Sequence, residues 1–597
     1  MRYSILASAI FVLIPIWINA AEPPVAGQFF VSPAGNDANP GTHTKPFASV
    51  TRARDAVRQV IAFGLRGDVT VLLNQGVYEL SEPLFFGPVD SGSEQFAITY
   101  AAQPGETVIL SGGKKISGWK RSEGGIWTVA VPGVAEGKWY FRNLFVHGNH
   151  AVRARFPNQD AQPDCLQLKG AELTKDLTRF TLTVAPGTLG DWRNAADVEI
   201  MVAGNWEINR KRVESLDAKG NRIVLAPPHQ SGPDYIFPRA GRWYHLENAR
   251  ELLDQPGEWY LDRKTGTLSY WPRPGEDMEK VEVVAPVSQQ LLVVKGTAQK
   301  PVRNLHFNGL RFEHTDWELP KEGYMGVQAS HYGHGEHPQQ RWKHIPASIC
   351  LTWAEHCSVE DGVLARIGGC GVEAAMGCRE NLIQGNQIFD VSANGILVDG
   401  PNVEAEVPKG NRVINNHVHA CGREFYGAVG IWVGFAQGTV VAHNLVHDLP
   451  YTGISVGWEW TPQPTVCKEN RIEYNHVYDV MNRLCDGGCI YTLGLQPGTV
   501  IRGNHLHDVH RSRLAQGAPN NGMFIDEGSK GFLFERNVIY RTAAELVRFN
   551  ACNRDWHTWR NNFIGDSEIS QTDAKEIMAQ AGLEPQYRQR LSEKAER

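Results

Sequence analysis

The second half of the chain repeats a pattern of one apolar residue, two variable residues, Asn, one variable residue and a second apolar residue. The pattern occurs at residues 383–388, 413–418, 441–446, 472–477, 501–506 and 534–539, so the asparagines recur about every 30 residues. Such self-similarity is typical of a solenoid. Most copies also contain a Gly–apolar pair, at Gly395, Gly430, Gly453, Gly488 and Gly522. Short strands separated by turns predict an all-β fold, a right-handed parallel β-helix solenoid.

The repeated asparagines are expected to turn inward at one corner, because a buried polar side chain needs hydrogen-bond partners on neighbouring coils. Three residues later stands an aromatic column, and aspartates often follow it. The columns are Phe389, His419, His447, Tyr478, His507 and Tyr540, then Asp390, Asp448, Asp479 and Asp508. Histidine and aspartate can bind metal, but their periodicity favours stacked aromatics and turn aspartates. We predict no metal and no cofactor.

The chain divides into five predicted segments. These are a signal peptide at 1–21, an N-terminal cap with the first coils at 22–115, an inserted β-rich domain at 116–285, the main β-helix at 286–566 and a helical tail at 567–597. Residues 50–58 have helical spacing and suit a cap, since the first coil otherwise exposes its core and strand edges. Within the insertion, strands at 259–262 and 268–271 flank a turn, which predicts a sandwich or a small barrel.

The N-terminus has the features of a signal peptide: Arg2, an apolar run from Ile5 to Ile18, and small residues at Asn19-Ala20-Ala21. No later segment is apolar for long enough to span a bilayer. We therefore expect a periplasmic or secreted protein with no membrane association after cleavage, and a monomer. The net charge of −6 comes without a basic stripe, so a nucleic-acid partner is not expected. The ten cysteines are not grouped like zinc ligands, and we expect buried thiols or one or two disulfides.

Two segments depart from the repeat, at 485–494 and 521–529, and each places a carboxylate beside glycine. Asp486 and Asp526 would lie on adjacent coils. Neighbouring coils of a β-helix are about 4.8 Å apart. Neighbouring acids can reach the separations used in glycoside hydrolysis, roughly 5–5.5 Å or 6.5–9.5 Å. One acid would have a raised pKa and the other would be ionised. The structural alternative is a turn aspartate and a strand-end charge, as at Asp399, which has the same offset from its glycine as Asp526.

The register raises a difficulty for this pair. If Gly488 stacks on Gly522, Asp526 lies over Thr492 while Asp486 is six residues earlier. Fully extended, that gap is about 20 Å, so the turn before the strand must fold back over its face. Glu527 and Glu459 are the reserve acids.

Aromatic and polar side chains near these segments suit sugar rings, which have apolar faces and polar edges. The structural alternative is that these aromatic side chains only cover the ends of strands. Trp432 is expected to point outward on the coil before residues 457–460. The candidate substrate-binding residues are Trp432, Trp458, Glu459, Trp460, Tyr491, His505, His507 and Glu527.

Several of these segments resemble known families. Residues 30–37, 40–42 and 45–47 resemble the start of secreted bacterial right-handed β-helix proteins. Residues 486–494 and 524–529, the inserted domain and residues 453–457 resemble glycoside hydrolase family 141. The resemblance implies catalytic acids at Asp486 and Asp526, and an α-L-fucosidase acting on complex pectin or an enzyme acting on xylan. It does not transfer a substrate.

The predicted function is an exported glycoside hydrolase that cleaves a complex plant or algal polysaccharide with two carboxylates. Two alternatives remain open. A polysaccharide lyase acting on a uronic-acid glycan would need a basic residue near the acids, and Arg502, Arg511 or Arg513 could supply it. A non-catalytic glycan-binding protein would use the aromatic residues alone.

Overall fold

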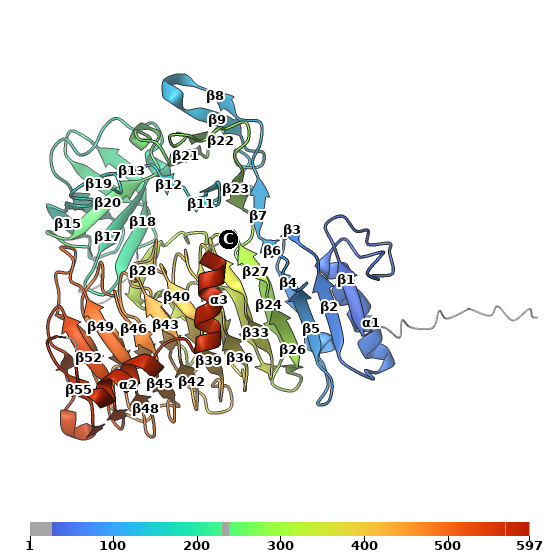
Figure 1. The fold of residues 1–597 in the computed structure, drawn as a ribbon. Helices are drawn as coiled ribbons and strands as arrows, with labels where there is room; N and C mark the ends of the chain where they lie inside the picture. The colour runs from blue at the N-terminus through green and yellow to red at the C-terminus, as the bar shows by residue number, and fades with distance from the viewer. Residues whose placement is uncertain (1–26, 230–237, 568, 596–597) are drawn as a thin grey trace, which may run out of the picture.

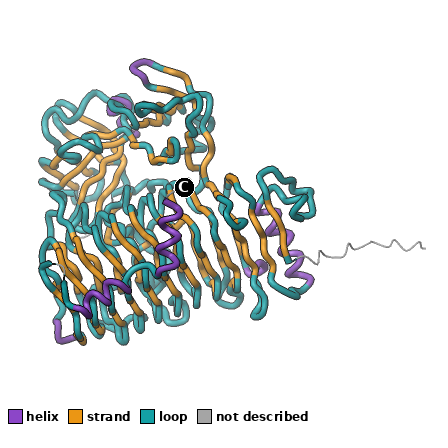
Figure 2. The backbone as a smooth tube through the Cα atoms, in the orientation of Figure 1, coloured by secondary structure: helices purple, strands orange, loops and turns teal. Residues whose placement is uncertain are grey.

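Three long parallel sheets wind along the chain and form a β-helix, with a separate β-rich domain above it (Figures 1 and 2). The computed structural model describes residues 27–229, 238–567 and 569–595. The predicted signal peptide lies outside these ranges. We name the sheets S1, S2 and S3 in the order in which a coil visits them. The all-β solenoid, the inserted domain and the helical tail are confirmed.

The strands of each sheet follow one another along the helix axis. Sheet S1 contains β1 (Gln28–Val31), β2 (Val69–Leu73), β5 (Ile98–Ala102), β26 (Leu305–Asn308), β33 (Ser358–Glu360), β36 (Leu382–Gln384), β39 (Arg412–Ile414), β42 (Val440–Ala442), β45 (Arg471–Glu473), β48 (Val500–Arg502), β51 (Leu533–Glu535) and β54 (Thr558–Arg560). Sheet S2 contains β3 (Gly76–Glu79), β6 (Val108–Ser111), β27 (Arg311–Glu313), β34 (Val363–Ala365), β37 (Gln387–Ile388), β40 (His417–His419), β43 (Leu445–His447), β46 (His476–Val477), β49 (His505–Val509), β52 (Val538–Thr542) and β55 (Phe563–Ile564). Sheet S3 contains β4 (Leu84–Phe86), β24 (Leu292–Lys295), β31 (Ala347–Thr352), β35 (Cys370–Ala374), β38 (Ile396–Val398), β41 (Ile431–Val433), β44 (Ile454–Val456), β47 (Gly487–Thr492), β50 (Asn520–Ile525) and β53 (Val547–Phe549).

Helix α1 (Val50–Phe63) is the predicted cap of the first coil. It begins after Ser49, whose side chain accepts a hydrogen bond from the Arg52 amide. Its buried residues Val50, Ala53 and Val57 belong to the same apolar core as strands β1 and β2. The helix therefore covers the apolar end that a solenoid would otherwise expose.

The asparagine repeat forms the predicted inward ladder. Asn416 is fully buried, and its Nδ2 donates to Asn444 Oδ1 at 3.1 Å and to the Ile383 carbonyl of the preceding coil at 2.9 Å. The same bonds recur from Asn386 to Asn562. Each side-chain amide thus bonds a backbone carbonyl of the preceding coil and the asparagine side chain of the next, which is the condition for burying it.

The aromatic column and the turn aspartates are also confirmed on sheet S2. The rings of Phe389, His419 and His447 stack with centroid separations of 5.3 and 5.1 Å. Asp390 and Asp448 both have a φ of 52°, in the left-handed region that Asp tolerates better than most residues. The periodic aspartates are therefore turn residues of the coil.

The inserted domain leaves the β-helix after β7 (Gly113–Lys115) and returns through β23 (Val283–Pro286), which pairs with β7. A large antiparallel sheet includes β15 (Gly170–Leu173), β16 (Phe180–Thr183), β17 (Glu199–Ala203), β18 (Ile208–Asp217), β19 (Arg222–Leu225) and β20 (Trp243–Glu247), with β13 (Arg155–Phe156) and β14 (Leu166–Gln167) beside β20. A second sheet contains β12 (Val152–Arg153), β21 (Glu258–Asp262), β22 (Thr267–Tyr270), β9 (Trp127–Ala130) and β8 (Lys120–Arg121). The hairpin of β21 and β22 is the one expected from the sequence. The pair β10 (Phe145–Val146) and β11 (Asn149–His150) joins β23. Two separate apolar cores hold the domain together.

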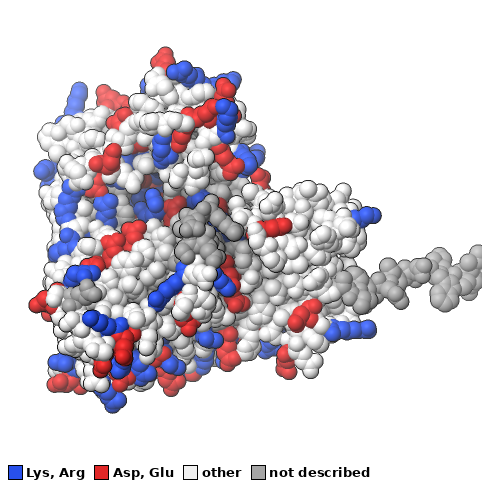
Figure 3. Space-filling model, viewed as in Figure 1, with Lys and Arg blue, Asp and Glu red and all other residues white. Residues whose placement is uncertain are grey.

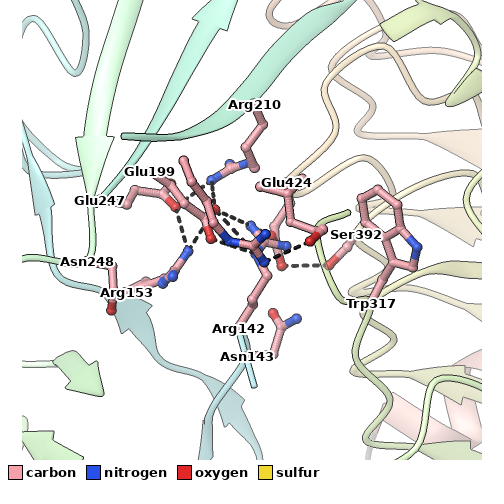
Figure 4. Close-up of polar contacts among 12 residues, drawn as sticks. Arg142, Asn143, Arg153, Glu199, Arg210, Glu247, Asn248, Trp317, Ser392 and Glu424 are labelled. Atoms are coloured by element: carbon pink, nitrogen blue, oxygen red, sulfur yellow. Dashed lines mark hydrogen bonds and ion pairs between the residues drawn. The ribbon is translucent and has the colours of Figure 1, made fainter. Parts of the chain in front are cut away.

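A buried network of arginines and glutamates fastens the inserted domain to the β-helix (Figure 4). Arg142 Nη2 lies 3.1 Å from Glu199 on β17 and 2.9 Å from Glu424, in a turn of the β-helix. Arg210 Nη1 lies 2.5 Å from Glu247. These arginines hold the pKa of Glu199 and that of Glu247 below the usual range, against the effect of burial. Each charge in the network has an opposite partner, as buried ions require.

Two further segments cover the β-helix. Strand β28 (Tyr324–Gln328) pairs with β18 of the insertion and leads into β29 (His331–Tyr332) and β30 (Lys343–His344). The tail forms α2 (Thr572–Gln580) and α3 (Pro585–Ala595); Ala574 and Ile577 of α2 pack on Val538 and Tyr540 of sheet S2. All ten cysteines lie in the described part of the chain and are free, so the disulfide alternative is wrong. No helix in the described ranges is long and apolar enough to cross a membrane.

Candidate active site

The two segments that break the repeat form adjacent strands of sheet S3. Strands β47 and β50 pair in parallel, with Gly488 opposite Asn521 and Thr492 opposite Ile525. The predicted stacking of Gly488 on Gly522 is therefore wrong by one residue. The chain instead places Cys489 between Gly453 and Gly522, because a small buried side chain also fits this column. Asp526 and Asp486 are thus one residue further apart along the strands than expected.

Alternate residues of sheet S3 face outward. By register, Ser455, Tyr491, Phe524 and Arg548 form one outward column across strands β44, β47, β50 and β53. Asp526 follows β50 directly, two residues after Phe524, so it continues on the same face. The site therefore has an aromatic floor with an acid at its edge.

Asp526 is held by two donors from neighbouring coils. The Tyr491 hydroxyl donates to Asp526 Oδ2, and Asn550 Nδ2 donates to Oδ1 at 2.7 Å. The side chain is buried, and burial raises the pKa of Asp526 above its usual value although both hydrogen bonds lower it. Charge-assisted hydrogen bonds of this kind stabilise the ionised carboxylate.

Asp486 stands in a different environment. It has a φ of 70°, so the chain turns sharply immediately before β47. Burial, and then the charge of Asp526, raise the pKa of Asp486 to about 7. Its carboxyl has no hydrogen-bond partner within the ranges that the structure describes. The two acids therefore lie within electrostatic reach of each other despite their separation along the strands.

The glycines of this segment are needed for close packing. A Cβ on Gly488 would lie 2.2 Å from the Asn521 carbonyl oxygen, and one on Gly487 would lie 2.4 Å from Thr452 Oγ1. A Cβ on Gly528, which has a φ of 73°, would meet the backbone of Thr461 at 2.2 Å. The Asp-Gly-Gly and Asp-Glu-Gly sequences therefore let neighbouring chain segments approach both acids.

The inserted domain and the strand that it holds contribute groups that the sequence did not indicate. Gln328, at the end of β28, donates from Nε2 to the Tyr451 hydroxyl at 3.4 Å, and the Tyr451 hydroxyl donates to the Asp486 carbonyl at 2.9 Å. Asn205 of the insertion accepts from the Cys485 amide at 3.0 Å through its carbonyl oxygen. Gln328 and Asn205 lie outside the repeat, so no periodic signal could have identified them.

The tryptophans lie further along sheet S3 and are less accessible than expected. Trp432 points outward as predicted, but it is completely buried beneath His331 and Trp458, with ring centroids 5.0 and 4.9 Å away. Trp458 is also buried. Neither ring is free to stack on a sugar, because the β28–β30 segment covers them. Trp460, half-buried and 4.5 Å from Trp458, keeps an open side.

The reserve acids stand at the edge of the site. Glu527 is exposed, and burial together with the charge of Asp526 raises its pKa. Glu459 is half-buried and has a φ of 126° in the loop that packs on Gly494 and Gly528. Both acids flank the site without the paired donors that hold Asp526.

His505 and His507 are not part of this arrangement. Both lie on β49 of sheet S2, where His507 stacks on Tyr540 and His505 accepts from or donates to the Tyr540 hydroxyl at 2.8 Å. The sequence placed them near Asp486 because they follow it closely in the chain. The coil turns to another sheet in between, so that proximity is lost in the fold.

A cavity of about 310 Å³ lies between the inserted domain and the β-helix and includes neither acid. Arg142, Arg153, Arg210 and Glu424 line it, and Figure 3 shows Lys and Arg side chains gathered in this band. These arginines already pair with Glu199, Glu247 and Glu424. We favour Asp486 and Asp526 as the reacting groups, because a carboxyl neutralised by arginine is a poor proton donor.

Two family models match the chain. The model of the GH141 insertion domain matches residues 124–273, and that of the right-handed beta helix region matches residues 347–539. No curated protein matches the chain in sequence. The predicted resemblance is therefore confirmed in both parts of the fold.

Solved structures give the same result. A protein described as a glycoside hydrolase is 26% identical, with a TM-score of 0.82, and the match covers 94% of this chain and all of that one. XylC in complex with xylose is 16% identical with a TM-score of 0.49, over 87% of this chain and 70% of its own. A rhamnogalacturonan lyase is 12% identical with a TM-score of 0.40, over 91% and 90%. The last two are too distant to carry an argument. The chain is a right-handed β-helix protein with the GH141 insertion domain, and the predicted enzyme class, glycoside hydrolase, is confirmed.

Proposed function

We propose that the protein hydrolyses a glycosidic bond with Asp486 as the proton donor and Asp526 as the nucleophile or base. The observation that carries the assignment is the contrast between the two carboxyls. Asp526 accepts hydrogen bonds from Tyr491 and Asn550, whereas Asp486 has a pKa of about 7 and no hydrogen-bond partner within the described residues. Paired acids whose surroundings separate their pKa values are the usual basis of this chemistry.

The proton is best placed on Asp486. Two interacting carboxyls titrate as a pair, and a single shared proton resides on the one whose ionised form is less stabilised. Burial raises the pKa of both, but the donors to Asp526 oppose this effect. Asp486 can then protonate the leaving oxygen while Asp526 attacks the anomeric carbon or activates a water.

Tyr491 and Arg548 position and tune this pair. Burial keeps the pKa of Tyr491 well above its usual value, so its hydroxyl remains a donor to Asp526. Arg548 lies on the next coil, and its positive charge lowers the pKa of both acids, partly opposing burial. The site thus holds one proton and one negative charge near neutral pH.

We further propose that the substrate is a complex plant or algal polysaccharide and that the enzyme acts as an α-L-fucosidase or on xylan. The family resemblance supports this substrate class. Residues 1–21 support export to the periplasm or the medium, which sequencing the N-terminus of the mature protein would check.

The function is tested by screening plant and algal polysaccharides with the wild type beside Asp486→Asn and Asp526→Asn. We expect release of reducing sugar by the wild type and strong loss in both variants. Full activity in both variants would show that the site is wrong. A product with the ultraviolet absorption of an unsaturated uronide would instead indicate a lyase.

The basic residues considered for a lyase are engaged elsewhere. Arg502 pairs with Glu535 at 2.7 Å on sheet S1, and Arg513 pairs with Asp164 of the insertion. Arg511 donates to the carbonyls of Ala518 and Gly517, both at 2.8 Å. None of these contacts is made to Asp486 or Asp526, although the charge of Arg511 lowers the pKa of Asp486. The engagement of Arg502 and Arg513 elsewhere supports hydrolysis over elimination.

A further inference from the structure

Three histidines meet on the outer face of sheet S2, away from the proposed active site. His417 and His419 are separated by one residue on β40, so their side chains share a face. His447 on β43 pairs with His419 across the ladder. One ring nitrogen of each histidine lies within 4.8 Å of the other two. Two positions on one strand and one on its neighbour thus bring three imidazoles together on a rigid sheet.

Some ring nitrogens of these histidines have no hydrogen-bond partner within the described residues. His417 Nε2 lies 2.8 Å from His447 Nε2, and one of the two must supply the proton for a hydrogen bond. His419 Nε2 and His417 Nδ1 are buried with no partner within the described residues. A buried nitrogen without a partner is costly and needs an explanation.

We propose that His417, His419 and His447 bind one divalent transition-metal ion of the zinc or copper class. Imidazole nitrogens suit these ions, and three histidines with one open position for water are a familiar ligand set. The ion would accept the lone pair of His419 Nε2 and replace the contact between His417 and His447. It would link adjacent coils through β40 and β43.

The surroundings favour a cation. Asp448 and Asp479 carry the nearby charges that act on His447, and both are negative. His417, unlike His419 and His447, lines a cavity of about 470 Å³ beside Gln387 and Tyr587, so the cluster borders open space on its His417 side.

A second histidine cluster on the same face provides an internal comparison. His476, His505 and His507 also approach within 4.8 Å of one another. There, His505 Nε2 is bonded to the Tyr540 hydroxyl at 2.8 Å and His507 Nδ1 to Asp508 at 2.6 Å. Arg541 Nη2 lies 3.4 Å from His507 Nδ1, and its positive charge opposes a second cation. We therefore assign the ion to the first cluster.

The proposal is tested by zinc titration of tag-free, metal-stripped full-length protein in a calorimeter. We expect one ion per chain. His419→Phe and His447→Tyr should each weaken binding at least about tenfold. Both substitutions keep the aromatic stack, because Phe389 and Tyr478 occupy this column in neighbouring coils. His505→Val, matched to Val538 in the next coil, should bind zinc like the wild type.

A spectroscopic readout keeps the test independent of any variant that folds poorly. Cu²⁺ bound to the wild type should show hyperfine coupling to several imidazole nitrogens in electron paramagnetic resonance, and His419→Phe should show coupling to fewer of them. Wild-type zinc binding weaker than roughly 100 µM, or binding unchanged in both His419→Phe and His447→Tyr, would overturn the proposal. Glycosidase activity is measured alongside as a control for folding.

Discussion

The outer faces of sheets S2 and S3 are built from the same coils but carry different chemistry. On S2, rings recur in register from Phe389 to Tyr540 and stack on one another, and the tail helix α2 packs over their end. On S3, the outward column changes from Trp432 to Ser455, Tyr491, Phe524 and Arg548 within five adjacent coils. The β28–β30 segment, which pairs with β18 of the inserted domain, covers part of this second face. The outward columns of sheet S2 therefore follow the sequence repeat, whereas the outward column of sheet S3 departs from it at the proposed active site.

The acids of the molecule show the same difference. Glu199 and Glu247 lie among arginines that hold the pKa of each below the usual range. Asp486 lies without such a partner, and burial raises its pKa to about 7. Burial is common to all three, so the arginines decide which acids are structural. The predictions below test this contrast, from the largest expected effect to the smallest.

Replacing Asp526 with Asn should abolish the glycosidase activity proposed for the site on sheet S3. The amide cannot act as nucleophile or base, so we expect kcat/KM to fall on the order of a thousandfold or more. Asp399→Asn is the matched control, because Asp399 has the equivalent position in an earlier coil, where it accepts from the Phe435 amide at 2.8 Å. Steady-state kinetics of both variants would measure this; equal losses would contradict the contrast.

The pH dependence of activity should follow the ionisation of Asp486. Its acid form is active, so kcat/KM should fall about tenfold per unit as the pH rises above about 7. The free energy of unfolding should also fall as the pH rises. A carboxyl whose pKa is raised on folding stabilises the protein below its unfolded pKa, and this stabilisation is lost as the pH rises through about 7. Asp486→Asn should therefore be relatively more stable than the wild type at pH 9 than at pH 5, measured by thermal unfolding. An unchanged difference would contradict the raised pKa.

Tyr491→Phe should have a smaller effect on activity. It removes one donor to Asp526 and leaves the ring on the floor of the site. The pKa of Asp526 should rise further, so the acidic limb of the pH profile should move to higher pH, with a loss of about 1–3 kcal/mol of transition-state stabilisation. Profiles of kcat/KM for the wild type and the variant would show the shift. A uniform loss at every pH would mean that the hydroxyl does not tune Asp526.

His419→Phe should leave activity unchanged within about twofold, since His419 lies on the S2 face and Phe389 shows that the column accepts phenylalanine. Assay of the purified variant beside the wild type tests this. A large loss of activity would mean that the two faces are not functionally separate.

Much of the fold could be predicted because its signal is periodic. The inward asparagines such as Asn416, the stacked His419 and the turn residue Asp448 each follow from one coil repeated. The register at Gly488 could not be read correctly, because Cys489 replaces glycine in the column and shifts the alignment by one residue. A periodic signal identifies a column but not a substitution within it.

The candidate site was only partly predictable. Asp486 and Asp526 are identified as departures from the repeat, but the groups around them come from elsewhere. Gln328, on a strand held by the inserted domain, donates to Tyr451, which donates to the Asp486 carbonyl, and Asn550 of the following coil donates to Asp526. Trp432 has the predicted direction, yet the segment at β28–β30 buries it. Contacts between distant segments depend on how the insertion docks, and no local pattern encodes that.

The division of roles between Asp486 and Asp526 is tested most directly by varying the leaving group. An aryl glycoside with a very acidic phenol needs no proton donor, whereas a natural glycosidic bond does. We predict that Asp486→Asn keeps most activity on the activated glycoside and loses at least about a hundredfold on the natural substrate, while Asp526→Asn loses both. Equal losses of Asp486→Asn on the two substrates would contradict the assignment of Asp486 as the proton donor.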